Sequence, residues 1–361
     1  MTAHDRCLPV NLIEDLSPVI RYPIAFLLPM VGALLLTPAV ARLAHRHEVL
    51  DHPGGHKVHG QATPYLGGLA VGGGLMLVGL FAAGTNGELL TILGAGLMLG
   101  LVGLRDDVRS VSPWWRLSFE AAAGLALWVV GVRAGVFDLT ITDLPLTVLW
   151  VVTVVNAFNF IDNMDGAAAG IAAASAIGIA AIAGHNGDFL VASLALAVGG
   201  AAIGFLRYNF PPAKIFLGDA GSMLLGFLVA ALTLKLDLPV GDAAPRVLST
   251  VLLAAVPLFD LTLVMTARTI GRRPLMLGGT DHTTHRLREQ GLPVRLVLLI
   301  MIAAQGICSA LSFIVYQQPS EVVLVVGGAL AVTWLMMLWL FLRMPEAATT
   351  REATAGVVVA S

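Results

Sequence analysis

The chain has 361 residues, of which 57% are hydrophobic and only 12% are charged. Soluble domains carry roughly 25% charged residues, so this composition, with a mean hydropathy of +0.85, excludes an ordinary soluble protein and predicts a polytopic membrane protein. The formal net charge of −2 gives no indication of a nucleic-acid partner. Cys7 and Cys308 are the only cysteines, so we expect neither a disulfide framework nor a cysteine metal site.

Apolar runs that could cross a bilayer follow one another along the chain. A span needs about 20 apolar residues, and by the hydropathy rule we predict an all-α membrane bundle of about 11 transmembrane helices. The predicted spans are 20–44, 66–84, 88–104, 117–135, 144–156, 166–184, 189–207, 220–238, 246–268, 295–316 and 322–343. Losing the short fifth span would move several later motifs to the other side of the membrane. We expect residues 1–345 to form one integral membrane domain, followed by a short C-terminal cytoplasmic tail, 346–361.

The connections between these spans fall alternately on two sides, and the cations are unequally shared. Sixteen of the 21 Lys and Arg residues lie on one side. The positive-inside rule makes that side cytoplasmic, with the N-terminus outside and the C-terminus inside. All of the unusual polar segments then lie on the cytoplasmic face.

The first two of these segments carry a lysine and a pair of aspartates. Lys57, in KVHGQATPYLGG, either contacts a phosphate or is an ordinary cytoplasmic lysine, and Gly68 and Gly72 predict close helix packing. Asp106 and Asp107 are adjacent at the foot of the third span, where a cation would relieve their repulsion. Carboxylates suit Mg²⁺; a solvated end of the span is the alternative.

The segment NAFNFIDNMDG places a polar side chain at every third position: Asn156, Asn159, Asp162 and Asp165. Neighbours three residues apart lie side by side on a helix, although all four align only on a 3₁₀ turn or at a helix end. Carboxylates at the edge of a bilayer are costly to hold. We therefore predict a polar or metal-binding patch that faces a cavity, with helix caps as the alternative.

Two further segments follow the seventh and ninth spans. In FLGDAGS, Asp219 is either an N-cap or lies beside a phosphate at the helix N-terminus, and Phe216 either stacks on a base or anchors the interface. In DHTTHR, His282 and His285 are three residues apart, but a zinc site needs more ligands. Guanidinium groups such as Arg286 match phosphate geometry, so we predict an anion clamp; a positive-inside topology signal alone is the alternative.

Acidic groups suited to Mg²⁺ and basic groups suited to phosphate, on one face of a membrane bundle, indicate phosphoryl transfer. One substrate would be cytosolic and the other a lipid that enters between helices. Asp260, inside the ninth span, either faces the same cavity or has a buried partner. An ion-coupled transporter is an alternative, but transporters bind near the bilayer midplane on broken helices, whereas these residues cluster at one face. A third hypothesis is a non-catalytic lipid-binding or regulatory protein.

As an ordered set, KVHGQATPYLGG, RDD, NAFNFIDNMDG, IFLGDAGS and DHTTHRL resemble the polyprenyl-phosphate N-acetylhexosamine-1-phosphate transferase family, glycosyltransferase family 4. The resemblance implies that a polyprenyl phosphate, undecaprenyl or decaprenyl phosphate, attacks the sugar-bearing phosphorus of a UDP-sugar and releases UMP, the first membrane step of an envelope glycan such as lipopolysaccharide or cell wall. It also implies a Mg²⁺ cofactor, with Mn²⁺ as an alternative, and an active site on the cytoplasmic face of the inner membrane. We expect no nucleic-acid partner, and a homodimer is left open.

The resemblance also implies roles for individual residues. Asp106 and Asp107 match an acidic pair assigned to metal or lipid-phosphate activation, and Asp219 matches a carboxylate that binds Mg²⁺. Phe216 matches a residue near the uracil. Together with the residue patterns, these matches give Asp106, Asp107, Asp162, Asp165, His282 and His285 as catalytic candidates, Lys57, Asn156, Asn159, Phe216 and Arg286 as substrate-binding candidates, and Asp107 and Asp219 as metal ligands.

Two departures from the family pattern bear on the substrate. The second acidic motif usually reads DGxDGL, whereas here both carboxylates remain in DNMDGA. The histidine motif is often HxHH, whereas HTTH lacks the middle histidine. Because the muramoyl-pentapeptide branch carries consecutive histidines, this favours an enzyme of the undecaprenyl-phosphate GlcNAc-1-phosphate type. A phospho-N-acetylmuramoyl-pentapeptide transferase stays the alternative.

Overall fold

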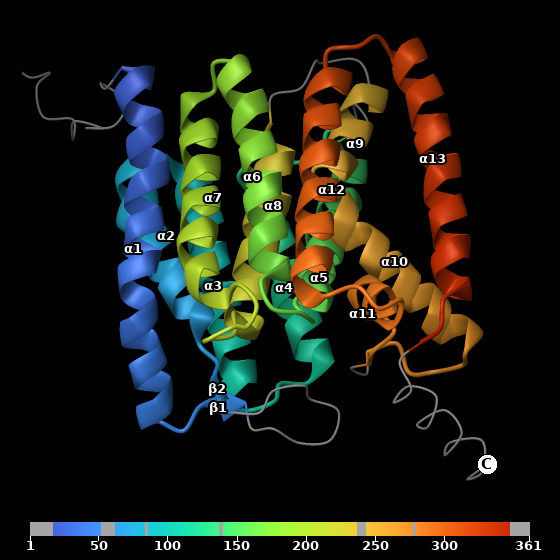
Figure 1. Ribbon diagram of the computed structural model, residues 1–361. Coiled ribbons are helices and arrows are strands. Elements are labelled where there is room, and N and C mark those ends of the chain that lie inside the picture. Colours follow the sequence, from blue (N-terminus) through green and yellow to red (C-terminus); the bar gives the residue numbers. More distant parts are fainter. Residues whose placement is uncertain are drawn as a thin grey trace, which may run out of the picture.

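A computed structural model describes residues 17–51, 62–83, 86–136, 140–236, 243–276 and 279–346. These residues form thirteen α-helices and one two-stranded antiparallel sheet (Figure 1). The helices are α1 (Pro18–Arg46), α2 (Gly67–Ala83), α3 (Gly87–Val108), α4 (Pro113–Val129), α5 (Thr140–Ile161), α6 (Ala167–His185), α7 (Phe189–Asn209), α8 (Gly218–Lys235), α9 (Ala243–Leu252), α10 (Ala255–Ile270), α11 (Thr283–Glu289), α12 (Val294–Val315) and α13 (Ser320–Arg343), and the strands are β1 (Leu50–Asp51) and β2 (Thr63–Pro64).

The bundle confirms the prediction of a polytopic helical membrane protein. In the described part of the chain, eight helices are long and apolar enough to cross a membrane, and a ninth span results if α9 and α10, bent by 79° at their junction, count as one. The short predicted fifth span is the full-length helix α5. By contrast, α2 and α4 have 17 residues each, about 26 Å of helix against a hydrocarbon core of about 30 Å. The count of about eleven therefore stays a prediction.

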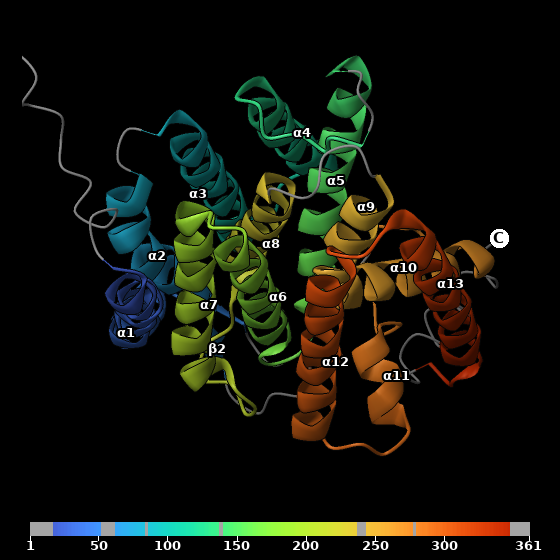
Figure 2. The same ribbon diagram turned by 90° about the horizontal axis from the view of Figure 1, so that it is seen from above.

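Helix α8 forms the centre of the bundle, where it packs against α2, α3, α5 and α6 (Figure 2). Every side chain from Ala220 to Leu234 is buried. A Cβ on Gly103 of α3 would collide with the Asp219 carbonyl, and a Cβ on Gly68 of α2 would collide with the Gly221 backbone. The close packing predicted at Gly68 is thus confirmed, and these two helices approach the first turn of α8 at backbone distance.

Helix α13 lies at the edge of the bundle and is its most exposed span (Figures 1 and 2). Of its residues, only Val323 and Phe341 are buried. Phe341 packs edge-on against Phe259 of α10, which also contacts Trp334. These rings belong to a small apolar cluster separate from the main core. Helix α13 is therefore attached to the protein in two places, against α9, where Leu248 lies beside Gly327, and against α10 near Phe341.

Candidate functional site

A polar cavity of 670 Å³ lies at the end of the bundle that carries β1, β2 and α11. Its wall includes Asp162 and Asp165 from the α5–α6 connection, Phe216 from the α7–α8 connection, and His285 and Arg288 of α11. Four residues predicted from three separate sequence segments therefore face one cavity. The fifth, Arg288, belongs to the arginine-rich loop that predicted an anion clamp.

The first turn of α8 is capped by a carboxylate from another helix. Asp107, near the end of α3, accepts the backbone N–H groups of Asp219 at 2.8 Å and Ala220 at 3.1 Å. Gly218 has φ +74°, and a Cβ there would lie 2.7 Å from the Asp107 Oδ2 atom. A residue with a side chain would be strained and crowded at this position, so glycine permits the contact between α3 and α8.

Because Asp107 supplies the cap, the Asp219 side chain is directed to other partners. Its Oδ1 atom accepts Nδ2 of Asn159 at 2.7 Å, and its Oδ2 atom accepts Nη1 of Arg116 at 2.9 Å. The same Arg116 nitrogen lies 2.8 Å from Oδ2 of Asp106. One guanidinium thus joins two acidic motifs. The sequence analysis missed Arg116, because no local pattern relates it to a carboxylate 103 residues away.

Both interpretations of the Asn/Asp run are realised in the structure. Asp165 accepts the backbone N–H of Ala213 at 2.9 Å and so ties down the α7–α8 connection. Asp162 accepts the backbone N–H of Gly218, and burial, followed by the nearby Asp219 and other carboxylates, raises the pKa of Asp162 well above its ordinary value. Asp162 therefore faces the cavity within a cluster of like charge.

The donors of this acidic cluster suit a magnesium ion that also binds the substrate. Among the described residues, no group of three or more His, Cys, Asp or Glu side chains could hold a metal ion alone. Mg²⁺ does not require such a cage, since it is commonly bound by one or two carboxylates together with water and substrate phosphates. The Asp219 side chain is 30% exposed, and Asp162 lines the cavity. These two oxygen donors, with Asp107 beside them, fit that kind of site.

The histidine segment is held by Asp260, which has a buried partner as one of its two interpretations predicted. The Oδ2 atom of Asp260 lies 2.8 Å from Nδ1 of His282, and its Oδ1 atom accepts the backbone N–H of Thr283 at 2.7 Å. His285 instead lines the cavity. Burial, and then the neighbouring His282, lower the pKa of His285 to about 4. Its imidazole is therefore neutral near pH 7 and can both donate and accept a hydrogen bond.

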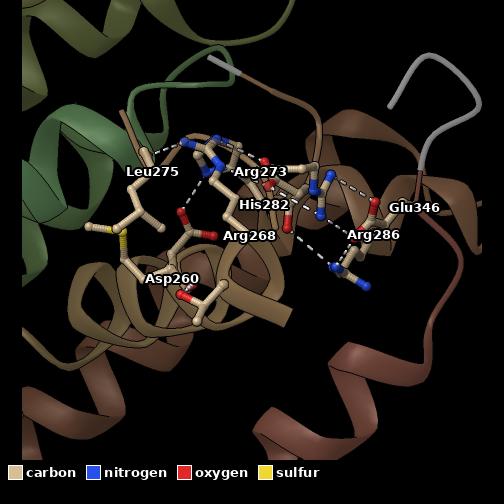
Figure 3. A network of polar contacts seen from close by, with 10 residues as sticks. Asp260, Arg268, Arg273, Leu275, His282, Arg286 and Glu346 are labelled. Atoms are coloured by element: carbon tan, nitrogen blue, oxygen red, sulfur yellow. Dashed lines mark hydrogen bonds and ion pairs between the residues drawn. The ribbon is translucent and has the colours of Figure 1, made fainter. Parts of the chain in front are cut away.

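The arginines of the same loop are largely neutralised by acidic partners (Figure 3). Arg268 binds both carboxylate oxygens of Asp281 at 2.9 Å, and Arg273 binds Glu346 at 2.9 and 3.0 Å. Burial alone would raise the pKa of Asp281, but Arg268 outweighs it and holds that pKa below its ordinary value. In the described part of the loop, Arg288 makes no ion pair and lines the cavity.

Two residues predicted to bind substrate are directed away from the cavity. Arg286 is buried and donates to the carbonyls of Phe341 and Met344 and to Glu346, each at 2.9 Å. Asn156 donates to the buried carboxylate of Glu120 at 2.5 Å and to a carbonyl of its own helix. Each side chain satisfies a buried partner, which the sequence pattern alone did not reveal. Lys57 lies outside the described residues.

An aromatic pair at the cavity includes one residue that the sequence analysis did not single out. The rings of Tyr65 and Phe216 have centroids 5.6 Å apart, and both residues line the cavity. Burial, followed by the charge of Asp51 and other carboxylates, raises the pKa of Tyr65. Tyr65 lies within KVHGQATPYLGG, so its segment was recognised although the residue was not.

A second cleft, of 470 Å³ and almost entirely apolar, lies between α3 and α4. Leu101 and Trp115 on its wall are 54% and 64% exposed, so the cleft opens to the outer surface of the bundle. Its polar end is formed by Arg105 and by Val111, whose backbone N–H donates to Asp106. The acidic cluster therefore lies between the apolar cleft and the polar cavity.

Comparison with known proteins identifies a family for this chain. Residues 89–237 match the model of the family described as glycosyl transferase family 4. A Bacillus subtilis (strain 168) protein named "Probable undecaprenyl-phosphate N-acetylglucosaminyl 1-phosphate transferase" is 33% identical, over 78% of this chain and 82% of the relative. The decaprenyl-phosphate N-acetylglucosaminephosphotransferase of Mycobacterium tuberculosis (strain ATCC 25618 / H37Rv) is 31% identical, over 85% and 86%. The undecaprenyl-phosphate alpha-N-acetylglucosaminyl 1-phosphate transferase of Thermotoga maritima is 30% identical, over 70% and 77%.

Proposed function

Because this chain belongs to glycosyl transferase family 4, we propose that it transfers GlcNAc-1-phosphate from a UDP-sugar to undecaprenyl or decaprenyl phosphate and releases UMP. One observation carries the proposal. Carboxylates from three distant segments, Asp107, Asp162 and Asp219, lie near one another, and Asp162 lines a polar cavity together with His285 and Arg288. Acidic groups for a metal ion beside cationic and hydrogen-bonding groups for phosphates support phosphoryl transfer from a diphosphate.

In the proposed reaction, an oxygen of the polyprenyl phosphate forms a bond to the sugar-bearing phosphorus. The bond from this phosphorus to the bridging oxygen breaks, and UMP leaves with that oxygen. The second pKa of a phosphate monoester is about 6, so the attacking phosphate is already largely ionised near neutrality and needs no strong general base. The protein's main tasks are to hold the two anions together and to offset their charge.

The polar cavity is the proposed donor site. Its 670 Å³ falls within the range of about 300–1,000 Å³ typical of small-molecule pockets. Phe216, beside Tyr65, would stack on the uracil, and Arg288 would contact the diphosphate. His285, neutral near pH 7, would hydrogen-bond to the sugar or phosphate. Lys57 stays a proposed phosphate contact.

We assign the metal to the acidic cluster. Asp219 would hold Mg²⁺, or Mn²⁺ as an alternative, with Asp107 and Asp162 beside it. When bound, the ion would offset the charge that develops on the diphosphate. Arg116 and Asn159 orient the Asp219 carboxylate, so they act as positioning residues for the metal ligand.

The apolar cleft between α3 and α4 is the proposed path of the prenyl chain. It opens on the outer surface of a bundle that is embedded in lipid, and it ends beside Asp106 and Arg116. An acceptor lying there would bring its phosphate to the acidic cluster from the side opposite the donor. The distribution of Lys and Arg supports an N-terminus outside, a C-terminus inside and a site on the cytoplasmic face of the inner membrane.

The test is UMP release by the purified full-length protein, with undecaprenyl phosphate and a panel of UDP-GlcNAc, UDP-GalNAc and UDP-MurNAc-pentapeptide. We expect release with UDP-GlcNAc that requires both substrates, stops on chelation with EDTA and returns with Mg²⁺. Release only with UDP-MurNAc-pentapeptide would assign the chain to the muramoyl-pentapeptide branch. Absence of UMP with every donor would overturn the proposal, and sugar-nucleotide uptake into liposomes without UMP would favour a transporter.

A further inference from the structure

The position of His285 depends on contacts outside its own helix. Helix α11 has seven residues, and an isolated helix of that length is not stable in water. Two of its anchors come from the bundle. Asp260 accepts the backbone N–H of Thr283, and the Thr284 hydroxyl donates to Oδ1 of Asn163.

A further anchor comes from α13, through Arg286. Its Nη1 atom donates to the carbonyls of Phe341 and Met344, and its Nη2 atom donates to Oε1 of Glu346, all at 2.9 Å. Figure 3 shows Arg286 extended towards Glu346 from the loop that also carries His282. The Arg286 side chain is only 1% exposed, so this guanidinium depends on protein groups for hydrogen bonds and charge compensation.

Glu346 joins two parts of the loop at this point. Its Oε1 atom accepts from both Arg286 and Arg273, and its Oε2 atom accepts Nη1 of Arg273 at 3.0 Å. Removal of Glu346 would leave two guanidinium groups close together with Asp281 as the remaining carboxylate, and Asp281 is already bound by Arg268. Helix α11 would then lose the charged one of its three hydrogen bonds to the segment that ends α13 and would keep the two to the carbonyls of Phe341 and Met344.

We propose that Glu346 and the C-terminal end of α13 are positioning elements for His285. Successive residues on an α-helix point about 100° apart, so fixing Arg286 towards α13 fixes the rotation of α11 and keeps His285 at the wall of the cavity. The role assigned to His285 rests on the proposed transferase function. The contact itself is a property of the structure that can be measured without turnover.

The first test measures hydrogen exchange of the backbone amides of residues 279–289 in the full-length protein in detergent. Glu346→Ala should raise exchange in this segment, and the isosteric Glu346→Gln should raise it less, because the amide oxygen still accepts from arginine. Glu321→Ala is the matched control, since it removes an exposed glutamate at the other end of α13 and should leave exchange unchanged. Wild-type exchange in Glu346→Ala would overturn the proposal.

The second test is a double-mutant cycle with UMP release as the readout. We expect Glu346→Ala to lower kcat roughly 10- to 100-fold, the loss expected when a group is displaced by about 1 Å. The loss should be much smaller in a His285→Gln background, because the two residues act through one position. Losses that multiply in the double variant would overturn the proposal. If the wild type releases no UMP, the proposed function fails, whereas the exchange measurement still decides whether Glu346 holds α11.

Discussion

The two walls of the polar cavity treat charge in opposite ways. The acidic wall is the cluster of Asp107, Asp162 and Asp219, of which Asp162 lines the cavity, and Arg116 binds Asp219. The acidic wall therefore carries more carboxylates than cations beside an accessible cavity. Such a cluster is stabilised by a cation that arrives with the substrate.

The basic wall is the reverse: Arg288 lines the cavity, and three arginines of the same segment that do not line it are paired with acidic residues before any substrate binds. Arg268 is bound by Asp281, and Arg273 and Arg286 are bound by Glu346. In the described residues, the acidic cluster thus shares the single cation Arg116, whereas most of the paired arginines of the arginine-rich loop form a frame. The number of arginines in a loop does not indicate how many are available to a phosphate.

The largest effect should come from the acidic wall. Asp219→Asn keeps the shape of the side chain and removes its charge, so we expect UMP release to fall by about 10³-fold or more, because the carboxylate proposed to hold the charge-offsetting metal ion is lost. Asp107→Asn should cost as much, since it also weakens the cap on α8. The measurement is UMP release at saturating Mg²⁺, with the thermal unfolding midpoint as a check on folding. Full activity in either variant would reject these assignments.

Arg116 is the next most sensitive point, because it joins Asp106 and Asp219. Arg116→Ala should lower kcat roughly 100-fold, as expected for a displaced metal ligand, and Arg116→Lys should retain more activity, because one nitrogen makes both contacts. The Mg²⁺ concentration that gives half-maximal rate should shift in the alanine variant. Arg109→Ala, which replaces an exposed arginine in the connection between α3 and α4, is the control. Equal losses in the two alanine variants would contradict this role.

On the basic wall, Arg288 is the proposed ligand contact, and its substitution tests whether it differs from the paired arginines of the frame. Arg288→Ala should raise the KM for UDP-GlcNAc roughly 10-fold, the loss of one charge-assisted hydrogen bond, and leave the KM for undecaprenyl phosphate unchanged. Arg272→Ala, in the same loop but exposed, should change neither. Steady-state kinetics with each substrate varied in turn would distinguish the cases. An unchanged KM for UDP-GlcNAc in Arg288→Ala would remove this residue from the donor site.

The smallest effect is a pH dependence of stability that arises from His285. Burial and His282 lower the pKa of His285 to about 4, from 6.5, so the unfolded chain takes up a proton on this residue at a higher pH than the folded protein does. Stability is therefore lost as the pH falls from about 6.5 to about 4. When the pH is lowered from about 7.5 to about 5, the thermal unfolding midpoint should fall in both proteins. The fall should be smaller in His285→Gln than in the wild type, by a few degrees. Equal losses in both proteins would contradict a neutral His285 in the folded state.

Much of the helical architecture could be predicted, because apolar runs of span length leave few alternatives in a bilayer. The length of α5 could not be predicted, since Asn156 and Asn159 end the apolar window although each has a partner inside the bundle. The 79° bend between α9 and α10 had no signal in the span pattern either. It depends on how these helices pack against α5, α12 and α13.

In the site, too, features set by nearby residues could be predicted, whereas contacts between distant segments could not. Carboxylates at span ends were recognisable because charge there is costly, and Asp162, Asp165 and His285 do face one cavity. The partners were not recognisable. From the sequence, Asp219 was a candidate N-cap of the helix that begins there, whereas in the structure Asp107 of α3 caps α8. The sequence around Arg286 does not indicate whether its guanidinium binds a phosphate or Glu346.

The cap that α3 provides for α8 has a mechanical consequence. Asp107 binds two N–H groups at the start of the central helix, so α3 and α8 cannot slide past one another without breaking both bonds. A change in bilayer thickness that tilts α3 must tilt α8 with it. The first turn of α8 and the end of α3 would therefore move together, while the outer helices adjust to the lipid. The geometry of the site would then depend little on the thickness of the surrounding membrane.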